Sequence, residues 1–169
     1  MKRVKFLLGV FLLSCICLQA QSKWIVAPLA GVAMNGDGSG TLNWGYNANL
    51  TLGRYVAYLG KHGRLRTDVC AGYFGFSENS AYSAAAMLTG CDDGTTEWYH
   101  SFSLGFGIQK SANRSKPDFI IPIRMTLPFT AYRFNDRMCL GLDWAVNFNL
   151  SDFGAGNFIY WGLFFEIGL

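Results

Sequence analysis

The sequence predicts an all-β fold, an eight-stranded antiparallel up-and-down barrel that follows an N-terminal targeting segment. Apolar residues alternate with small or polar residues over most of the chain, and this period of two is typical of strands with two different faces. The segments between these strands are rich in Gly, Asn, Asp and Ser, the residues that turns need. No later segment has 18 consecutive apolar residues, so we expect no transmembrane helix.

The N-terminal segment has the pattern of a secretory signal peptide. Residues 1–5 are cationic, residues 6–18 are apolar, and Ala20 offers a small residue at the cleavage position. The apolar stretch is shorter than the roughly 20 residues that a membrane-spanning helix needs, which argues against a retained anchor. Residues 12–15 also resemble a bacterial lipobox, which would instead leave a lipidated Cys15 at the mature N-terminus.

Composition sets limits on the mature chain. Hydrophobic residues make up 51% of the sequence and charged residues only 15%, which excludes a disordered tail. The net charge of +3 is that of the signal segment, where Lys2, Arg3 and Lys5 lie, and the rest of the chain is balanced. No basic patch indicates nucleic-acid binding. Residues 21–169 suit a single barrel domain behind a signal peptide at residues 1–20.

Eight segments carry the strand pattern, most clearly residues 140–150, where every second residue is large and apolar. The alanine-rich segment 80–90 fits a short helix equally well. We assign it as a strand because single-chain bacterial barrels have an even number of strands. The predicted strands are residues 23–34, 41–59, 64–76, 80–90, 97–109, 119–130, 140–150 and 161–169.

Alternation alone does not decide which face points outward, because a soluble barrel alternates too, with its apolar face inside. The polar positions here are mostly Gly, Asn, Ser and Thr, whereas about a quarter to a third of a soluble surface is charged. Trp and Phe crowd the apolar face and would overfill a small lumen. We therefore predict a transmembrane barrel with its apolar face in lipid. A secreted lipocalin-like barrel, with the aromatic face inward around a small apolar ligand, remains the alternative.

The positions of Trp and Tyr support the membrane prediction. Barrels of the outer membrane carry aromatic girdles at both interfaces, and most of the Trp and Tyr residues lie near the predicted strand ends. The predicted girdle consists of Trp24, Trp44, Tyr46, Tyr55, Tyr58, Tyr73, Trp98, Tyr132, Tyr160 and Trp161.

Charged residues on the other face are expected to project into the lumen, which eight strands leave just wide enough for side chains to fill. Buried charges are costly unless they are paired. We interpret the set as a mutually neutralised network that plugs the barrel, with a narrow polar pathway or a proton-sensitive plug as the alternative. Its predicted members are Arg66, Asp68, Glu97, Arg124, Asp143 and Glu166.

We also examine the sequence for a catalytic pair, a disulfide, and a metal or cofactor site. His100 and Ser101 are adjacent in a predicted strand and so point to opposite faces, which argues against a catalytic pair. Three cysteines follow the signal segment, Cys70, Cys91 and Cys139, and the last two lie near one rim, where an oxidising compartment permits a disulfide. No metal-ligand spacing and no phosphate-binding loop occurs, so we expect no metal and no cofactor.

The signal peptide, the closing alternation at 161–169 and the stretch 118–124 followed by Leu140-Gly-Leu resemble small outer-membrane β-barrel proteins, in particular the porin-like barrels of the Bacteroidetes. Two features depart from this family: the chain ends in Leu169 rather than Phe, and Pro122 and Pro128 predict a bulge or local irregularity because proline cannot donate a ladder hydrogen bond.

The resemblance implies a location in the outer membrane, with outer-membrane lipid and the barrel-assembly machinery as partners and no nucleic acid. It also implies a non-enzymatic role in envelope structure, as a small pore or in binding through the surface loops. A lipid-remodelling enzyme of the outer membrane is a further alternative. The ligand, the protein partner and the oligomeric state are left open.

Overall fold

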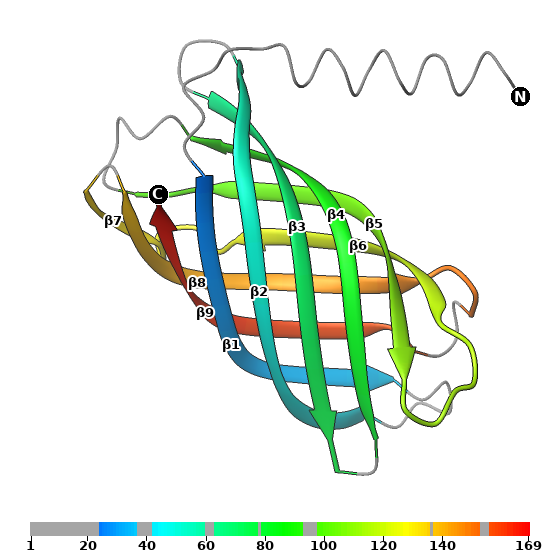
Figure 1. The fold of residues 1–169 in the computed structure, drawn as a ribbon. Coiled ribbons are helices and arrows are strands. Elements are labelled where there is room, and N and C mark those ends of the chain that lie inside the picture. Colours follow the sequence, from blue (N-terminus) through cyan, green and yellow to red (C-terminus); the bar gives the residue numbers. More distant parts are fainter. Residues whose placement is uncertain are drawn as a thin grey trace, which may run out of the picture.

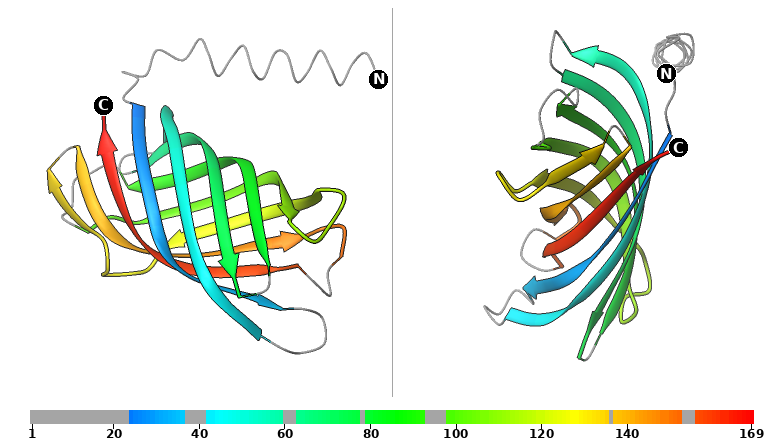
Figure 2. Two further views of the ribbon diagram at one scale, coloured as in Figure 1. Left: turned by 60° about the horizontal axis from the view of Figure 1, so that its bottom comes forward. Right: turned by 90° about the vertical axis from the view of Figure 1, so that its left-hand side faces the viewer.

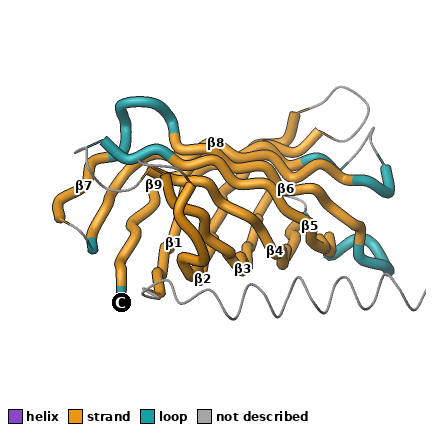
Figure 3. Tube along the Cα trace, turned by 90° about the horizontal axis from the view of Figure 1, so that it is seen from above, coloured by secondary structure: helices purple, strands orange, loops and turns teal. Residues whose placement is uncertain are grey.

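The computed structural model describes residues 24–36, 42–59, 63–77, 79–92, 98–135, 137–152 and 156–169. The predicted signal peptide with its cleavage site, Cys15, and Glu97 of the predicted lumenal network lie outside these residues. Described residues form strands and loops only (Figure 3). None of their segments is a helix long and apolar enough to cross a membrane.

The described residues form nine strands that follow one another in sequence (Figure 1). Their bounds are β1 Trp24–Gly36, β2 Leu42–Leu59, β3 Gly63–Phe76, β4 Ser80–Asp92, β5 Ser101–Ser111, β6 Asp118–Thr126, β7 Tyr132–Asn135, β8 Met138–Asn149 and β9 Phe158–Gly168.

The sheet closes into a barrel of eight antiparallel positions. Neighbours in sequence are neighbours in space from β1 to β6, and β1 also pairs with β9, which pairs with β8. Both β6 and the short β7 pair with β8, so together they fill one position in the wall and complete the ring. Figure 2 shows the curved sheet and the oblique run of its strands. The predicted eight-stranded up-and-down barrel is therefore confirmed.

The predicted strand at 80–90 is also confirmed. β4 is 13 residues long and pairs along its length with β3 on one side and with β5 on the other. Its alanines face outward at residues 84 and 86 and inward at residues 81 and 85, in the same alternation as the strands beside it. Neighbours on both sides thus determine the conformation of this segment, whose own helix propensity is high.

The predicted irregularity at Pro128 is a break between β6 and β7. Phe129 has a positive φ of 59°, and the Thr130 hydroxyl donates to the Leu127 carbonyl at 2.7 Å, which closes a tight turn. The effect at Pro122 is milder: β6 keeps its register against β5, but the paired residues skip from Ile120 to Ile123. Both prolines therefore disturb the wall without opening the ring.

The two faces of the wall have opposite character. Large apolar side chains such as Trp44, Phe106 and Phe119 are exposed on the outside at 62%, 72% and 66%. The inward positions hold most of the buried polar residues, together with an apolar cluster that includes Phe74, Phe158 and Phe164. The predicted outward direction of the apolar face is confirmed, and the lumen contains more aromatic bulk than the sequence indicated.

Both chain termini of the barrel lie at one end, where the Leu169 amide donates to the Trp24 carbonyl at 2.7 Å. We call this the terminal end. The opposite end, where β3 gives way to β4 and β5 to β6, is called the loop end.

A close approach of backbones at the β1–β9 seam requires glycine. A Cβ on Gly31 would overlap the Trp161 carbonyl and come within 2.5 Å of Gly162 Cα, both of which are backbone atoms. Gly36, in the same strand, has open space where its Cβ would be.

We expect Gly31→Ala to destabilise the barrel by about 1–3 kcal/mol, the usual cost of overpacking, whereas Gly36→Ala leaves stability unchanged. Urea titration followed by tryptophan fluorescence measures both variants. Equal unfolding midpoints for the two would contradict the close approach at the seam.

Candidate functional site

The lumen holds a cluster of charged side chains in the middle of the barrel. Arg66 and Asp68 on β3, Arg124 on β6, Asp143 on β8 and Glu166 on β9 are all buried. Each occupies an inward position of its strand, because alternate residues share a face. The structure therefore brings together five of the six predicted members, from four strands, and the sixth, Glu97, lies outside the described residues.

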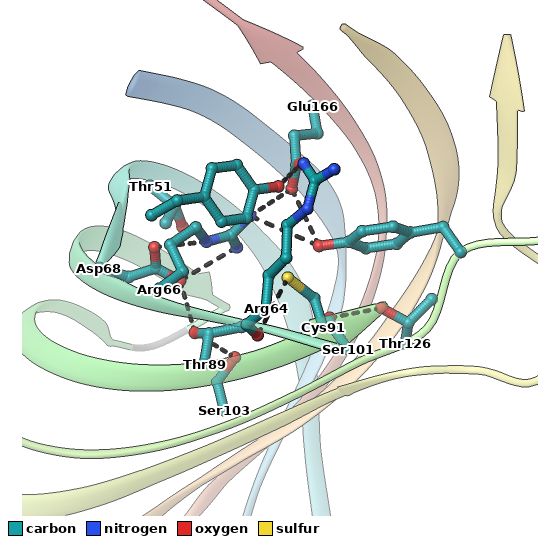
Figure 4. Close-up of polar contacts among 12 residues, drawn as sticks. Thr51, Arg64, Arg66, Asp68, Thr89, Cys91, Ser101, Ser103, Thr126 and Glu166 are labelled. Carbon is teal, nitrogen blue, oxygen red and sulfur yellow. Dashed lines mark hydrogen bonds and ion pairs between the residues drawn. The ribbon is translucent and has the colours of Figure 1, made fainter. Parts of the chain in front are cut away.

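Arg66 is the hub of this cluster (Figure 4). Its Nη1 lies 2.7 Å from Glu166 Oε2, and its Nε and Nη2 lie 2.7 and 3.0 Å from the two carboxylate oxygens of Asp68. The Tyr99 hydroxyl donates to the same Glu166 oxygen at 3.2 Å. One guanidinium thus joins β3 to β9 across the lumen, and it is 2% exposed. The contacts of Nη1 with Glu166 and of Nη2 with Asp68 are charge-assisted hydrogen bonds, the strong kind in a protein interior.

Arg124 forms the second cationic centre. Its Nε lies 3.6 Å from Asp143 Oδ2 and its Nη2 lies 3.8 Å from Asp68 Oδ2, while Nη1 donates to the Thr51 hydroxyl at 2.9 Å. The Thr89 hydroxyl donates to Asp68 at 2.6 Å. Asp68 therefore links the two arginines, and the network reaches β2 and β4 through threonine hydroxyls.

The network leaves almost no free space. The cavity among Arg66, Tyr99, Arg124, Asp143 and Glu166 measures about 10 Å³, which is room for about one water molecule. Three carboxylates face two guanidiniums here, and hydroxyls of Thr and Tyr supply further donors to the carboxylates. The arrangement can hold charge and bind strands together, but it offers no volume for a substrate.

Several members of the lumenal cluster were not predicted from the sequence. Tyr99 lies on the predicted inward face, yet its hydrogen bond to Glu166 depends on strands that are far apart in sequence. Arg133 pairs with Asp92 at 2.7 Å and lies 5.4 Å from the centre of the Tyr99 ring. No local pattern marks these contacts, because they form only when the sheet closes.

Most of the predicted aromatic girdle is on the outer surface. Trp44 stacks on Trp161 with ring centres 6.5 Å apart, and Trp98 meets Tyr132 edge-to-face at 6.3 Å. Seven of the ten predicted residues are exposed or half-buried in this way: Trp24, Trp44, Tyr46, Tyr73, Trp98, Tyr132 and Trp161. Tyr58 is also exposed, but it follows the bulge in β2 and is paired with Arg64 on the inward face of β3, with its ring 5.9 Å from that guanidinium.

Tyr55 and Tyr160 are corrections to the predicted girdle. Tyr160 is 5% exposed and packs inside the barrel against Phe74 at 5.2 Å, because it is adjacent to Trp161 and adjacent residues of a strand face opposite sides. The hydroxyl of Tyr55 donates to Glu166 at 3.4 Å inside the lumen. Both tyrosines add to the filling of the barrel rather than to its girdle.

The two candidate catalytic residues contact different side chains, and the two candidate disulfide cysteines are not bonded to each other. His100 is exposed and its ring lies 6.3 Å from that of Phe129, whereas the Ser101 hydroxyl is 2.7 Å from that of Thr126 on the inner side. The three described cysteines, including Cys91 and Cys139, are buried free thiols.

A separate polar pocket of about 320 Å³ lies at the loop end. Asparagine amides, serine hydroxyls and one guanidinium surround it, with Phe76 as its aromatic member. Arg114 is held there by Asp118 at 3.1 Å and Asp152 at 3.4 Å. The remaining lining residues are Asn35, Gly36, Asn43, Ser77, Asn79, Ser111, Asn113 and Gly156.

Comparison with solved structures identifies the class of fold. The chain is similar to Neisserial surface protein A, with a TM-score of 0.65 and 10% identity, over 87% of this chain and 97% of that one. It also matches the outer membrane enzyme PagL, with a TM-score of 0.48 and 15% identity, over 84% and 99% of the two chains. No protein-family model and no curated protein sequence matches the chain. The chain therefore has the small eight-stranded barrel fold of Neisserial surface protein A.

Removing the hub of the network should be costly, because it leaves the carboxylates of Asp68 and Glu166 buried without their main cation. We expect Arg66→Met to lower the free energy of unfolding by about 3–5 kcal/mol. The matched variant Arg114→Met removes a partly exposed ion pair and should cost less than about 1 kcal/mol. Urea unfolding of both variants checks the difference, and a small loss for Arg66→Met would show that the lumenal network contributes little.

Proposed function

We propose that the chain is an integral outer-membrane β-barrel protein with a closed lumen and no enzymatic activity, serving envelope structure or binding through its loop end. The observation that carries this proposal is the pairing of an apolar outer wall with a lumen filled by paired charges. In this proposal the chain is one of the porin-like barrels of the Bacteroidetes, which its sequence resembles.

The outer wall supports residence in lipid. The outward positions of β1, β8 and β9 are all apolar, from Trp24 to Met34, from Met138 to Phe148 and from Ile159 to Ile167. A water-facing surface of this size would carry many charges, and an exposed apolar area this continuous is typical of a surface that contacts lipid or a partner. The lipocalin-like alternative needs the predicted apolar face inside, whereas the structure has that face outside and fills the lumen with paired ions, amides and a smaller aromatic cluster.

The lumen supports a closed barrel rather than a pore. Ion conduction needs a continuous hydrated path, and the space around Arg66 and Glu166 holds about one water molecule. The charges around this space are paired with one another across the strands.

Separation of the nucleophile and base candidates supports a non-enzymatic role. The Ser101 hydroxyl is hydrogen-bonded to Thr126 and the His100 ring packs against Phe129, and no described hydrogen bond joins the two residues as nucleophilic catalysis requires. Unchanged lipid A in cells that overexpress the protein is the expected result, and lipid modification lost in His100→Ala would instead favour the lipid-remodelling alternative.

A binding role at the loop end is favoured by the polar pocket around Arg114. Amide and hydroxyl groups beside one aromatic ring suit a polar ligand with several hydroxyls. In this proposal the signal peptide directs export, cleavage follows Ala20, and the barrel-assembly machinery inserts the mature chain with its loop end outside.

Cell fractionation tests the proposed location. The protein should remain in the outer-membrane fraction and should migrate differently on a gel when it is not boiled, as a folded barrel does. Planar bilayers containing the purified protein should show no channel conductance. Recovery as a soluble periplasmic protein would refute the proposed location, and stable single-channel currents would refute the closed lumen.

A depth-dependent pair of variants tests the lipid-facing wall. Trp144 lies at the middle of β8, whereas Phe119 lies at the loop end of β6 and is 66% exposed. We expect Trp144→Lys to cost about 2–4 kcal/mol and to block membrane assembly, and Phe119→Lys to cost at most about 1 kcal/mol. The folded fraction on unboiled gels measures both. Normal assembly of Trp144→Lys would show that this face does not meet the lipid core.

A further inference from the structure

Three tyrosines form a continuous row on the outer wall at the loop end. Tyr73 on β3 and Tyr82 on β4 are directly paired across the two strands, with ring centres 5.1 Å apart. Tyr46 on β2 contacts Tyr73 at 5.9 Å. Tyr46 and Tyr82 are exposed at 58% and 62%. The row therefore presents phenol rings across three adjacent strands at one height of the barrel.

Lys110 continues this row on the next strand. It is the direct cross-strand partner of Tyr82, and it is exposed on the outer wall of β5 one residue before the strand ends. In the described part of the wall, it is the one charged residue at an outward strand position of the loop end. The other outward cation of comparable placement is Arg54, which stacks over Trp24 at the terminal end.

The charge of Lys110 is not neutralised by an acid of the described chain, since no ion pair joins it to a described carboxylate. Two acids in described segments of the loop end, Asp118 and Asp152, contact Arg114. The β5–β6 connection adds a second exposed lysine, Lys116. Lys110 and Lys116 are thus two exposed cations on this side of the described rim, and an anion is the partner complementary to them.

We propose that Tyr46, Tyr73, Tyr82 and Lys110 form a binding site for the phosphorylated headgroup of an outer-leaflet glycolipid. This inference rests on the proposed outer-membrane function, which places the loop end in the outer leaflet. Tyrosine is suited to this position because its ring packs against acyl chains and sugar faces while its hydroxyl reaches the polar layer. The lysine ammonium supplies the charge that a phosphate requires.

The position of the lysine also explains why a phosphate is favoured over an uncharged headgroup. A cation at the boundary between apolar wall and water interacts with an anionic lipid surface more strongly than a cation free in solution. Its stem can lie along the tyrosine ring while the ammonium extends toward the headgroups. The row thus combines three phenol rings with one positive charge.

Purified barrel in detergent, titrated with lipid A that carries two phosphates, tests the site by native mass spectrometry of the complex. We expect Lys110→Gln to weaken lipid A binding about fivefold, the effect of one basic residue near an anionic surface, and enzymatically dephosphorylated lipid A to bind wild type as weakly. The matched control Arg54→Gln, at the opposite rim, should bind like wild type. Tyr82→Leu should also weaken binding, while keeping the apolar contact.

Two results would overturn the site: equal affinity of wild type and Lys110→Gln for lipid A, or equal affinity of wild type for the phosphorylated and dephosphorylated forms. An equal loss in Arg54→Gln would likewise show a general charge effect in place of a site. Failure of the lipid site can be distinguished from failure of the proposed location. The location is tested by cell fractionation of the wild-type protein, and that result does not depend on what the purified barrel binds.

Discussion

Closure of the hydrogen-bond ladder between β1 and β9 is the constraint on which the rest of the structure depends. An open sheet of this length would leave two edges of unpaired N–H and C=O groups, which have no partner in an apolar environment. Once the first and last strands pair, each strand position has two neighbours, and every side chain must point either into the lumen or away from it. The Gly31–Gly162 pair allows the backbones to meet at this seam.

Closure then determines what the lumen can contain. Eight positions enclose a space that side chains fill, so the arginines and carboxylates inside cannot keep their water. Arg66 contacts both Asp68 and Glu166, and Arg124 lies between Asp68 and Asp143, so each cation has two acidic neighbours. The aromatic residues Phe74, Phe158 and Tyr160 pack against one another elsewhere in the same lumen. Between the paired charges the described cavity has room for about one water molecule.

The period of two was enough to predict the strands and the direction of their faces, because side-chain alternation is a local property of the backbone. The same alternation requires Tyr160 to face inward, because its neighbour Trp161 faces outward. The prediction that Tyr160 belongs to the aromatic girdle was wrong because it considered only the aromatic character of the side chain. The break at Pro128 was predicted because proline lacks an N–H group. The contacts of Tyr99 and Arg133 could not be predicted, since they join strands whose proximity exists only after closure.

The outer wall shows how little charge the fold tolerates and where it is placed. Apolar residues occupy nearly all outward positions, and the two cations described on this wall, Lys110 and Arg54, lie at opposite ends, each beside aromatic rings. A long basic side chain is tolerated there because its stem covers apolar surface while its charged group reaches water. The interior charges meet the same physical requirement differently, through partners on other strands. In both places a charge is found only where water or a partner of opposite charge can solvate it.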